Sequence, residues 1–476
     1  MPDAAIRRFF RLTFKLMSYR APHIPVPLQG GVLAGVTVVN PGGGRAECRT
    51  LVISGDRIVR LEQAHPAGGS LYAGMYVLPG LIDMHVHVGP PMRDLMGLLF
   101  LAHGVTTIRE TGDADGTTFD ARRRINAGQA AGPRILAGGP VLDGDPPFLP
   151  TSWRVRDASE ARMAVAELAA LGVDFVKVHH TLSAEALASI RAAAAEHRLK
   201  VVGHIPMSVA FADAHIWDVQ HLDGLVPYPG PGETVLDVQR KWRDLSPAAI
   251  DAYVRVSAQQ GLVHTPTLVC GERLVQAADP TPPVIPAARY MPRYVRDIAW
   301  DVKRSMPVLR RFTPETLAVM RQGLARGKEV VRQLQLYGVR LHTGTDTAGM
   351  PFVVPGASLH EELGHFVDAG LTAEQAWIAA TSAPAESLGV PGLGRVAAGM
   401  LADLAIFRAD PTRDIAALST LEAVVAQGRL YTRAALYDAL ERHRRAFESP
   451  LYERLSMALT ELGMRQMARQ GGLRIE

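Results

Sequence analysis

Short apolar segments alternate with longer amphipathic segments along most of the chain. The apolar segments are rich in Val, Ile, Leu and Thr, which is typical of strands, and the stretches between them are rich in Ala, Leu, Glu and Arg, which favour helices. Eight strands are predicted, at residues 80–88, 104–111, 133–140, 173–180, 200–205, 218–222, 261–269 and 338–346. The predicted helices are residues 92–103, 117–130, 157–171, 183–197, 247–260, 317–337 and 372–382.

This order of elements predicts an α/β chain built around a TIM (β/α)₈ barrel, whose chemistry would lie at the C-terminal ends of the strands. Gly-rich pairs of short strands flank the barrel on both sides, and neither group alone can close a core. We therefore expect the flanks to meet as one small β-sandwich built from both chain ends. The predicted domains are an amphipathic arm (1–25), the β-sandwich (26–79 plus 392–432), the barrel (80–391) and a helical tail (433–476).

Composition supports a globular enzyme-sized chain. With 476 residues, of which 47% are hydrophobic and 21% charged, the chain can bury one large core and a smaller domain. Its two cysteines, Cys48 and Cys270, cannot form a disulfide framework, so we expect a reducing, cytoplasmic location. No uninterrupted apolar run is long enough to predict a membrane span.

The net charge of +4 is concentrated at the chain ends, since residues 1–20 hold five basic side chains and one acidic one. The body has no broad basic face, which argues against nucleic acid as a partner. As a helix, residues 6–17 would place Ile6, Phe9 and Phe10 on one side, away from the arginines. This pattern fits contact with a membrane surface or packing on the helical tail or a sister subunit. We prefer packing, and expect a homo-oligomer.

The segment "GLIDMHVHV" ends in two histidines, His85 and His87. Residues two apart on a strand point to the same face, and two neutral imidazoles there can hold a metal ion. The pair alone is weak support, because core histidines are often simply hydrogen-bonded. Later strands end in the same way, however, with His204, His221 and Asp346. Five such side chains at one rim of a barrel predict a metal site.

Lys177 ends the apolar segment "VDFVKVHH". A buried lysine is costly to leave charged and unpaired, so a salt bridge to Asp346 is one interpretation of it. His179 and His180 could compete for a ligand role at the same place. Asp83 lies on the same strand face as His85, where it could orient a histidine ring or stabilise a turn.

The motifs "HVH", "VKVH", "GH", "QH" and "GTD", with "GLIDMHVH" before them and "TSAPAESLGVPGLGRVAAGMLADLAIF" after them, resemble the amidohydrolase superfamily. Within it the chain is similar to the imidazolonepropionase-like and Xaa-Pro dipeptidase-like branch, from about residue 30 to about residue 430. The resemblance implies two divalent metal ions, of which Zn²⁺ is the expected one. It assigns one ion to His85, His87 and Asp346, the other to His204 and His221, and an N6-carboxylated Lys177 to both.

The same resemblance implies cleavage of an amide C–N bond by metal-activated hydroxide, with Asp346 as base and then acid. The expected substrate is a small peptide or N-acyl amino acid, such as an Xaa-Pro dipeptide or an amide-linked toxin. One alternative is a mononuclear cyclic-amide hydrolase like imidazolonepropionase, which does not need Lys177. Another is a non-catalytic scaffold that retains the fold.

Substrate contacts are expected from two segments. The connection of roughly 70 residues before the last strand is far longer than usual and should cover the mouth of the barrel. Its Arg289, Arg293 and Arg296 could bind a substrate carboxylate, although surface positions are the alternative. Tyr228, after the sixth strand, resembles the tyrosine that dipeptidase-like relatives direct at the substrate, and a packed lid residue is the alternative there.

Overall fold

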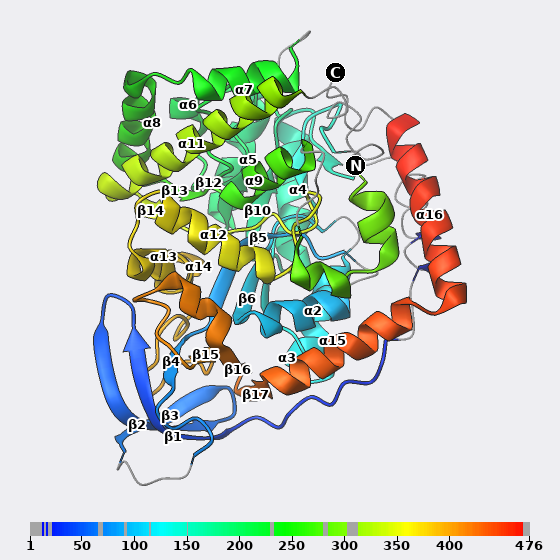
Figure 1. The fold of residues 1–476 in the computed structure, drawn as a ribbon. Helices are drawn as coiled ribbons and strands as arrows, with labels where there is room; N and C mark the ends of the chain where they lie inside the picture. Colours follow the sequence, from blue (N-terminus) through cyan, green and yellow to red (C-terminus); the bar gives the residue numbers. More distant parts are fainter. Residues whose placement is uncertain are drawn as a thin grey trace.

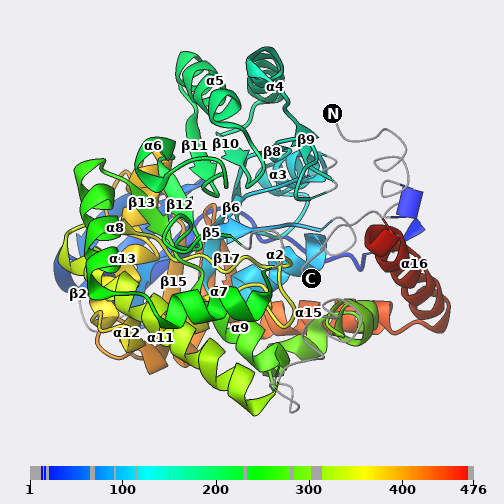
Figure 2. The ribbon, with the colours of Figure 1, turned by 90° about the horizontal axis from the view of Figure 1, so that it is seen from above.

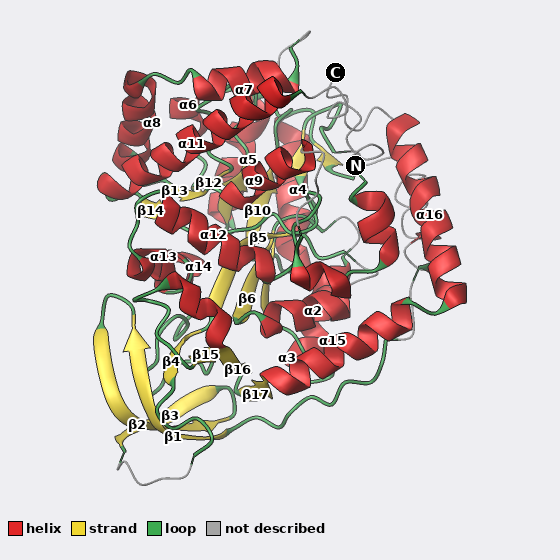
Figure 3. Ribbon diagram, in the orientation of Figure 1, coloured by secondary structure: helices red, strands yellow, loops and turns green. Residues whose placement is uncertain are grey.

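The computed structural model has α/β architecture, with helices on the outer side of the strands (Figures 1 and 3). It describes residues 12–13, 16–17, 21–64, 70–89, 93–113, 116–149, 151–228, 233–278, 284–301 and 313–469. A strand lies within each of the eight predicted segments, and a helix lies at each of the seven predicted positions. The α/β prediction is therefore confirmed.

Seven strands form a parallel sheet in the order β14-β13-β12-β11-β10-β8-β9. They are β8 (Leu142–Asp143), β9 (Trp153–Arg154), β10 (Phe175–Val178), β11 (Lys200–Gly203), β12 (Asp218–Gln220), β13 (Val263–Thr265) and β14 (Arg340–Leu341). Every pairing in this sheet is parallel. The carboxyl ends of these strands therefore share one edge.

A second parallel sheet contains β5 (Leu81–Val86), β6 (Val105–Glu110) and β7 (Arg134–Ala137). Backbone hydrogen bonds tie both of its edges to the larger sheet. On one side Met84 N donates to Thr343 O (3.0 Å) and His87 N donates to Thr347 O (2.9 Å). On the other side Asp174 N donates to Ala137 O (2.9 Å).

Helices follow most of these strands, and the capping residue before the first turn explains where two of the helices begin. Asp157 caps α4 and Ser183 caps α5, each by accepting a hydrogen bond from a backbone N–H in the first turn. Figure 2 shows α4 and α5 side by side next to β10 and β11. The helices are α2 (Arg93–Ala102), α3 (Thr117–Asn126), α4 (Ala158–Leu171), α5 (Ala184–Glu196), α6 (Phe211–Ala214), α7 (Val235–Arg243), α8 (Pro247–Gln259), α9 (Leu268–Ala278), η2 (Pro286–Tyr290), η3 (Val295–Ala299), α11 (Pro314–Leu336), α12 (Ala357–Asp368), α13 (Ala373–Ala379), α14 (Ser382–Leu388), η5 (Ile415–Thr420), α15 (Arg433–Phe447) and α16 (Pro450–Arg469).

Strands from both chain ends meet in one seven-stranded sheet, ordered β17-β16-β15-β4-β1-β2-β3. They are β1 (Gly31–Asn40), β2 (Gly44–Ser54), β3 (Arg57–Gln63), β4 (Tyr76–Pro79), β15 (Leu404–Phe407), β16 (Leu421–Ala426) and β17 (Arg429–Thr432). The two groups join where β4 pairs antiparallel with β15. Side chains of this sheet, among them Leu51, Val77 and Leu404, form a separate apolar cluster.

The chain ends lie near each other at one point. Tyr452 OH, on α16, donates to Met17 O (2.9 Å), and the Met17 side chain is buried. This contact fits the predicted packing of the arm on the helical tail. Ile6, Phe9 and Phe10 lie outside the described residues, so membrane contact stays a prediction. In the part of the chain that the structure describes, no helix has the length and apolar character needed to cross a membrane.

Candidate metal centre

The six predicted ligands lie at the carboxyl ends of five parallel strands. His85 and Lys177 are within the last residues of β5 and β10, and His204 and His221 directly follow β11 and β12. Asp346 follows β14 and is fixed beside β5, because its N–H donates to His85 O (2.7 Å). The strand order thus gathers residues that are up to 261 positions apart in the sequence.

One group of side chains surrounds the Asp346 carboxylate. Asp346 Oδ1 lies 3.1 Å from His87 Nε2 and 3.4 Å from His85 Nε2. Potential ligand atoms of His85, His221 and Asp346 all lie within 4.8 Å of one another. The His221 ring is 4.7 Å from the His85 ring and 4.8 Å from the His204 ring, measured between centroids. His221 therefore lies between this group and the next one.

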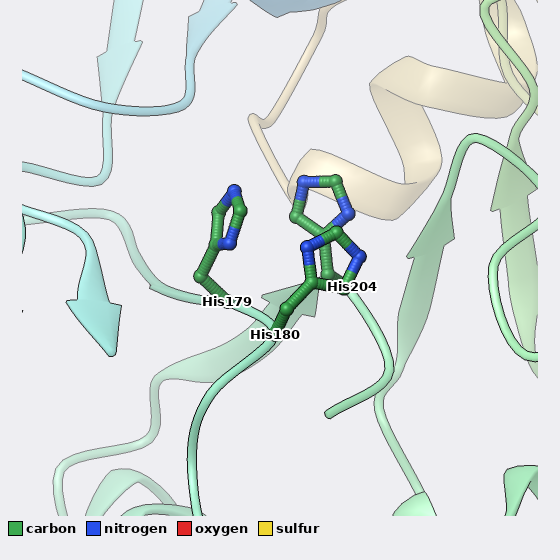
Figure 4. A group of neighbouring side chains, drawn as sticks. All are labelled: His179, His180 and His204. Atoms are coloured by element: carbon green, nitrogen blue, oxygen red, sulfur yellow. The ribbon is translucent and has the colours of Figure 1, made fainter. Parts of the chain in front are cut away.

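A second group contains His179, His180 and His204, whose rings lie close together in Figure 4. Their ring centroids are 4.1 to 4.6 Å apart. Asp223 Oδ2 accepts hydrogen bonds from His204 Nδ1 (2.5 Å) and His180 Nε2 (3.0 Å). From the sequence, His179 and His180 are expected only to compete for a ligand role, and Asp223 is not predicted, although "HLDG" places this acid just after a strand end.

Lys177 is buried beside both groups, with only 1% of its surface exposed. Its Nζ has no hydrogen-bond partner among the described residues, and the salt bridge to Asp346 is not formed. Burial lowers the pKa of Lys177 to about 8, against the opposing effect of the Asp346 charge. A buried amine of lowered pKa is partly neutral near pH 8, which is the form that reacts with carbon dioxide.

Three histidines at this site, His85, His204 and His221, are kept neutral. Burial lowers the pKa of His85 and His204 well below the usual value, and nearby positive charge, including that of Lys177, acts in the same direction. Burial also lowers the pKa of His221. Neutral imidazoles offer a lone pair to a metal ion, so this set of nitrogen and carboxylate donors fits divalent ions such as Zn²⁺.

Asp83 supports the site through the backbone. Its carboxylate accepts hydrogen bonds from the N–H of His85 (3.3 Å) and the N–H of Thr345 (3.0 Å), and from Thr345 Oγ1 (2.7 Å). Asp83 thus holds the ends of β5 and β14 together. Of the two roles considered for it, these bonds favour the stabilisation of local backbone.

A buried ion pair lies among the same strands. Arg109 Nη1, from β6, is 2.7 Å from Asp218 Oδ2, from β12, and both side chains are almost fully buried. Arg109 Nε also donates to Met84 O (2.7 Å), and Thr265 Oγ1 donates to Asp218 Oδ1 (2.9 Å). The sequence does not predict this pair, whose only signal is a charged residue in each of two predicted strands.

Tyr228 lies at the edge of the second group. Its ring is 4.3 Å from the His180 ring and 5.3 Å from the Phe148 ring. Burial raises the pKa of Tyr228, and the Asp223 carboxylate adds to the shift. The phenol therefore stays protonated and can donate a hydrogen bond.

The three predicted carboxylate-binding arginines lie near the helical tail: Arg289 on η2, Arg296 on η3, and Arg293 between these two elements. Arg289 and Arg293 are exposed; Arg289 contacts Tyr290 OH (2.5 Å), and Arg293 pairs with Asp297 (2.8 Å) and Glu453. Arg296 is partly buried. Substrate contact by these arginines stays a prediction.

Known proteins share a family sequence pattern and the fold with this chain. The sequence model of the amidohydrolase family matches residues 76–224 and 274–431. No curated protein matches the chain significantly. Among solved structures, bottromycin amidohydrolase is 23% identical, with a TM-score of 0.72 over 92% of this chain and 94% of that chain. A putative prolidase from Bifidobacterium longum is 23% identical, with a TM-score of 0.63 over 88% and 99% of the two chains. An Xaa-Pro dipeptidase with methionine bound in its active site is 20% identical, with a TM-score of 0.59 over 84% and 99%. At these identities the likeness demonstrates a shared fold.

Proposed function

We propose that the chain is a binuclear metal-dependent amidohydrolase, because it belongs to the amidohydrolase family, whose sequence model matches well over half of its length. Hydrolysis of carbon–nitrogen bonds follows from the family. The finer proposal is cleavage of an amide bond in a small peptide or N-acyl amino acid. The solved structures that resemble this chain include a prolidase, an Xaa-Pro dipeptidase and A. niger ochratoxinase. Their names favour a small peptide or N-acyl amino acid as the substrate.

The observation that carries the proposal is a buried lysine amine that has no hydrogen-bond partner in the described part of the chain and lies next to two groups of side chains that could hold metal ions. We propose that His85, His87 and Asp346 hold one ion, and that His204 and His221 hold the other. N6-carboxylation of Lys177 would give it two oxygen ligands to share between the ions. It would also remove the cost of a buried, unpaired ammonium.

Two divalent ions bound here, for which we expect Zn²⁺, would supply an acidified water and a Lewis acid for the scissile carbonyl. The chain's own residues would move the proton. Burial raises the pKa of Asp346, but the hydrogen bond with His87 and the charges around it lower the pKa below its usual value. Asp346 is therefore ionised, and its carboxylate can accept a proton and pass it to the leaving nitrogen. Tyr228 could donate a hydrogen bond to the substrate.

We also propose that the two parallel sheets close into one (β/α)₈ barrel over residues 80–391. The hydrogen bonds at both edges of the smaller sheet support this closure. Residues 26–79 and 392–432 would form the composite β-domain, with the arm (1–25) and the helical tail (433–476) as extensions. For these extensions we expect a role in homo-oligomer assembly, and the Tyr452–Met17 contact supports packing rather than membrane binding.

Metal counting and amide hydrolysis test the proposal together. Wild-type protein purified with Zn²⁺ and bicarbonate should hold two ions per chain and hydrolyse members of a panel of dipeptides and N-acyl amino acids. Asp346→Asn should lower kcat by about 10³-fold or more, because it removes a metal ligand and the proton acceptor. Lys177→Ala should hold fewer ions, and added short-chain carboxylates should restore part of its activity.

Two results would contradict the proposal in different ways. One ion per chain with full activity in Lys177→Ala would favour the mononuclear cyclic-amide hydrolase. Hydrolysis that is unchanged in Asp346→Asn, or absent from the wild type across the panel, would favour another active site or a non-catalytic scaffold.

A further inference from the structure

A cavity lies against the proposed metal centre, between helices α7, α9 and α11. It is a partly open cavity with a volume of about 160 Å³. Its lining residues are His221, Leu222, Gln239, Trp242, Pro266, Thr267, Leu268, Cys270, Gly271, Leu274, Met320, Gly323, Leu324 and Gly327. None of the arginines predicted to bind substrate is among them.

The cavity lining is largely apolar. Leu, Met, Pro and Trp side chains make up most of it, and among the described residues that line it only His221 can carry a positive charge. Glycines on α9 and α11 leave the space open. A Cβ on Gly327 would lie 3.7 Å from Leu268 Cδ2 and 4.0 Å from Leu222 Cδ1, at ordinary van der Waals distance from two leucines of the lining.

The floor of the cavity is in direct contact with the centre. Thr267 Oγ1 hydrogen-bonds His221 Nδ1 (2.6 Å), and Cys270 Sγ lies 3.7 Å from Asp346 Oδ2. A group bound in the cavity would therefore lie next to two of the side chains that we assign to the metal ions. Helix α9, which forms one wall of the cavity, is held in place because Glu362 accepts hydrogen bonds from its first N–H groups.

We propose that this cavity is the specificity pocket of the enzyme and that it takes a bulky apolar side chain, aromatic or branched aliphatic, of the amide substrate. The inference rests on the proposed function of the centre. Charged side chains would be disfavoured, since the described residues of the lining include no Lys, Arg, Asp or Glu that could replace their water. An apolar pocket discriminates by about 10-fold or more for each methylene that it buries. Substrates with Phe or Leu at this position should therefore exceed their Gly counterparts by at least about 100-fold in kcat/KM.

The test fills the pocket and leaves the centre intact. Gly327→Leu should lower kcat/KM for Phe- and Leu-containing dipeptides at least 10-fold, while Gly-containing dipeptides stay within about twofold of wild type. The matched control is Gly364→Leu, which makes the same change inside α12, where an added Cβ meets nothing within 4 Å. This control should alter neither class of substrate, and both variants should keep the metal content of the wild type.

Several outcomes would overturn the pocket proposal. One is a wild-type preference for dipeptides with Gly or charged side chains. The others are a Gly327→Leu variant that loses kcat/KM equally for Gly-containing and for Phe- or Leu-containing dipeptides, or one that loses none. If the wild type hydrolyses no amide, the proposed function fails, and calorimetric titration with N-acetyl-phenylalanine amide and N-acetyl-glycine amide then tests the pocket alone. Binding of the Phe amide only, abolished by Gly327→Leu, would support the pocket, and any other pattern would refute it.

Discussion

At the scale of single residues, Asp223 determines how the second group of histidines is held. One oxygen of its carboxylate accepts hydrogen bonds from His204 and from His180. A carboxylate bonded to the far nitrogen of a metal-binding histidine fixes the ring orientation and raises the basicity of the ligand. His221 has a hydroxyl partner in the same role, Thr267.

Asp223→Asn should weaken metal binding about 10- to 100-fold, because the amide cannot supply the negative charge that both rings share. Competition with a fluorescent chelator would measure the affinity. Asp251→Asn is the control, since Asp251 pairs on the surface with Arg255 and Tyr337. Equal affinities of wild type and Asp223→Asn would show that His204 does not depend on this carboxylate.

At the scale of elements, helix α9 depends on a residue far away in the sequence. Its first N–H groups, of Leu268 and Val269, donate to the two carboxylate oxygens of Glu362 on α12, at 3.0 and 2.7 Å. All three residues are buried, so water cannot take over these hydrogen bonds. The long-range cap fixes the start of the helix that carries Cys270 and one wall of the pocket.

Glu362→Ala should lower the free energy of unfolding by about 2 to 5 kcal/mol, because it leaves two buried N–H groups without partners. Glu362→Gln should lose less, since its amide oxygen can still accept one of these bonds. Urea denaturation would measure both values. Glu167→Ala, on the exposed face of α4, should change stability by no more than about 0.5 kcal/mol, and a similar small loss in Glu362→Ala would contradict the cap.

At the scale of the whole molecule, the fold buries many histidines in addition to those of the candidate centre. Burial lowers the pKa of His264 to about 4 and that of His360 to about 3. It also lowers the pKa of His365 and His443 to about 4. In the unfolded chain these side chains bind protons below about pH 6.5. The folded chain then holds fewer protons than the unfolded chain, so stability falls as the pH drops from about 6.5 toward 4.

In His264→Gln the free energy of unfolding should fall less steeply as the pH drops, by up to about 1.4 kcal/mol per pH unit, which is the linkage of one proton. Unfolding in urea at several values between pH 7.5 and 5, with saturating Zn²⁺ throughout, would measure the slope. The control is His197→Gln, at an exposed position. Protonation of the metal ligands affects both variants equally, so a difference between their slopes reports on His264. If the free energy of unfolding changes with pH at the same rate in wild type and His264→Gln, then His264 has the same pKa in the folded and in the unfolded chain.

The sequence predicted most of the strands, many of the helices and five polar side chains at strand ends, because alternation along a segment and polar residues at strand ends are local properties, and its resemblance to the amidohydrolase superfamily added Lys177 as the sixth candidate ligand. It did not locate β8 and β9, which are too short to leave a pattern. Only the tertiary structure paired Arg109 with Asp218, placed His179, His180 and Asp223 beside His204, and opened the pocket between α7, α9 and α11. These contacts join residues from different strands and helices, so they depend on strand order and helix packing, which no single segment contains.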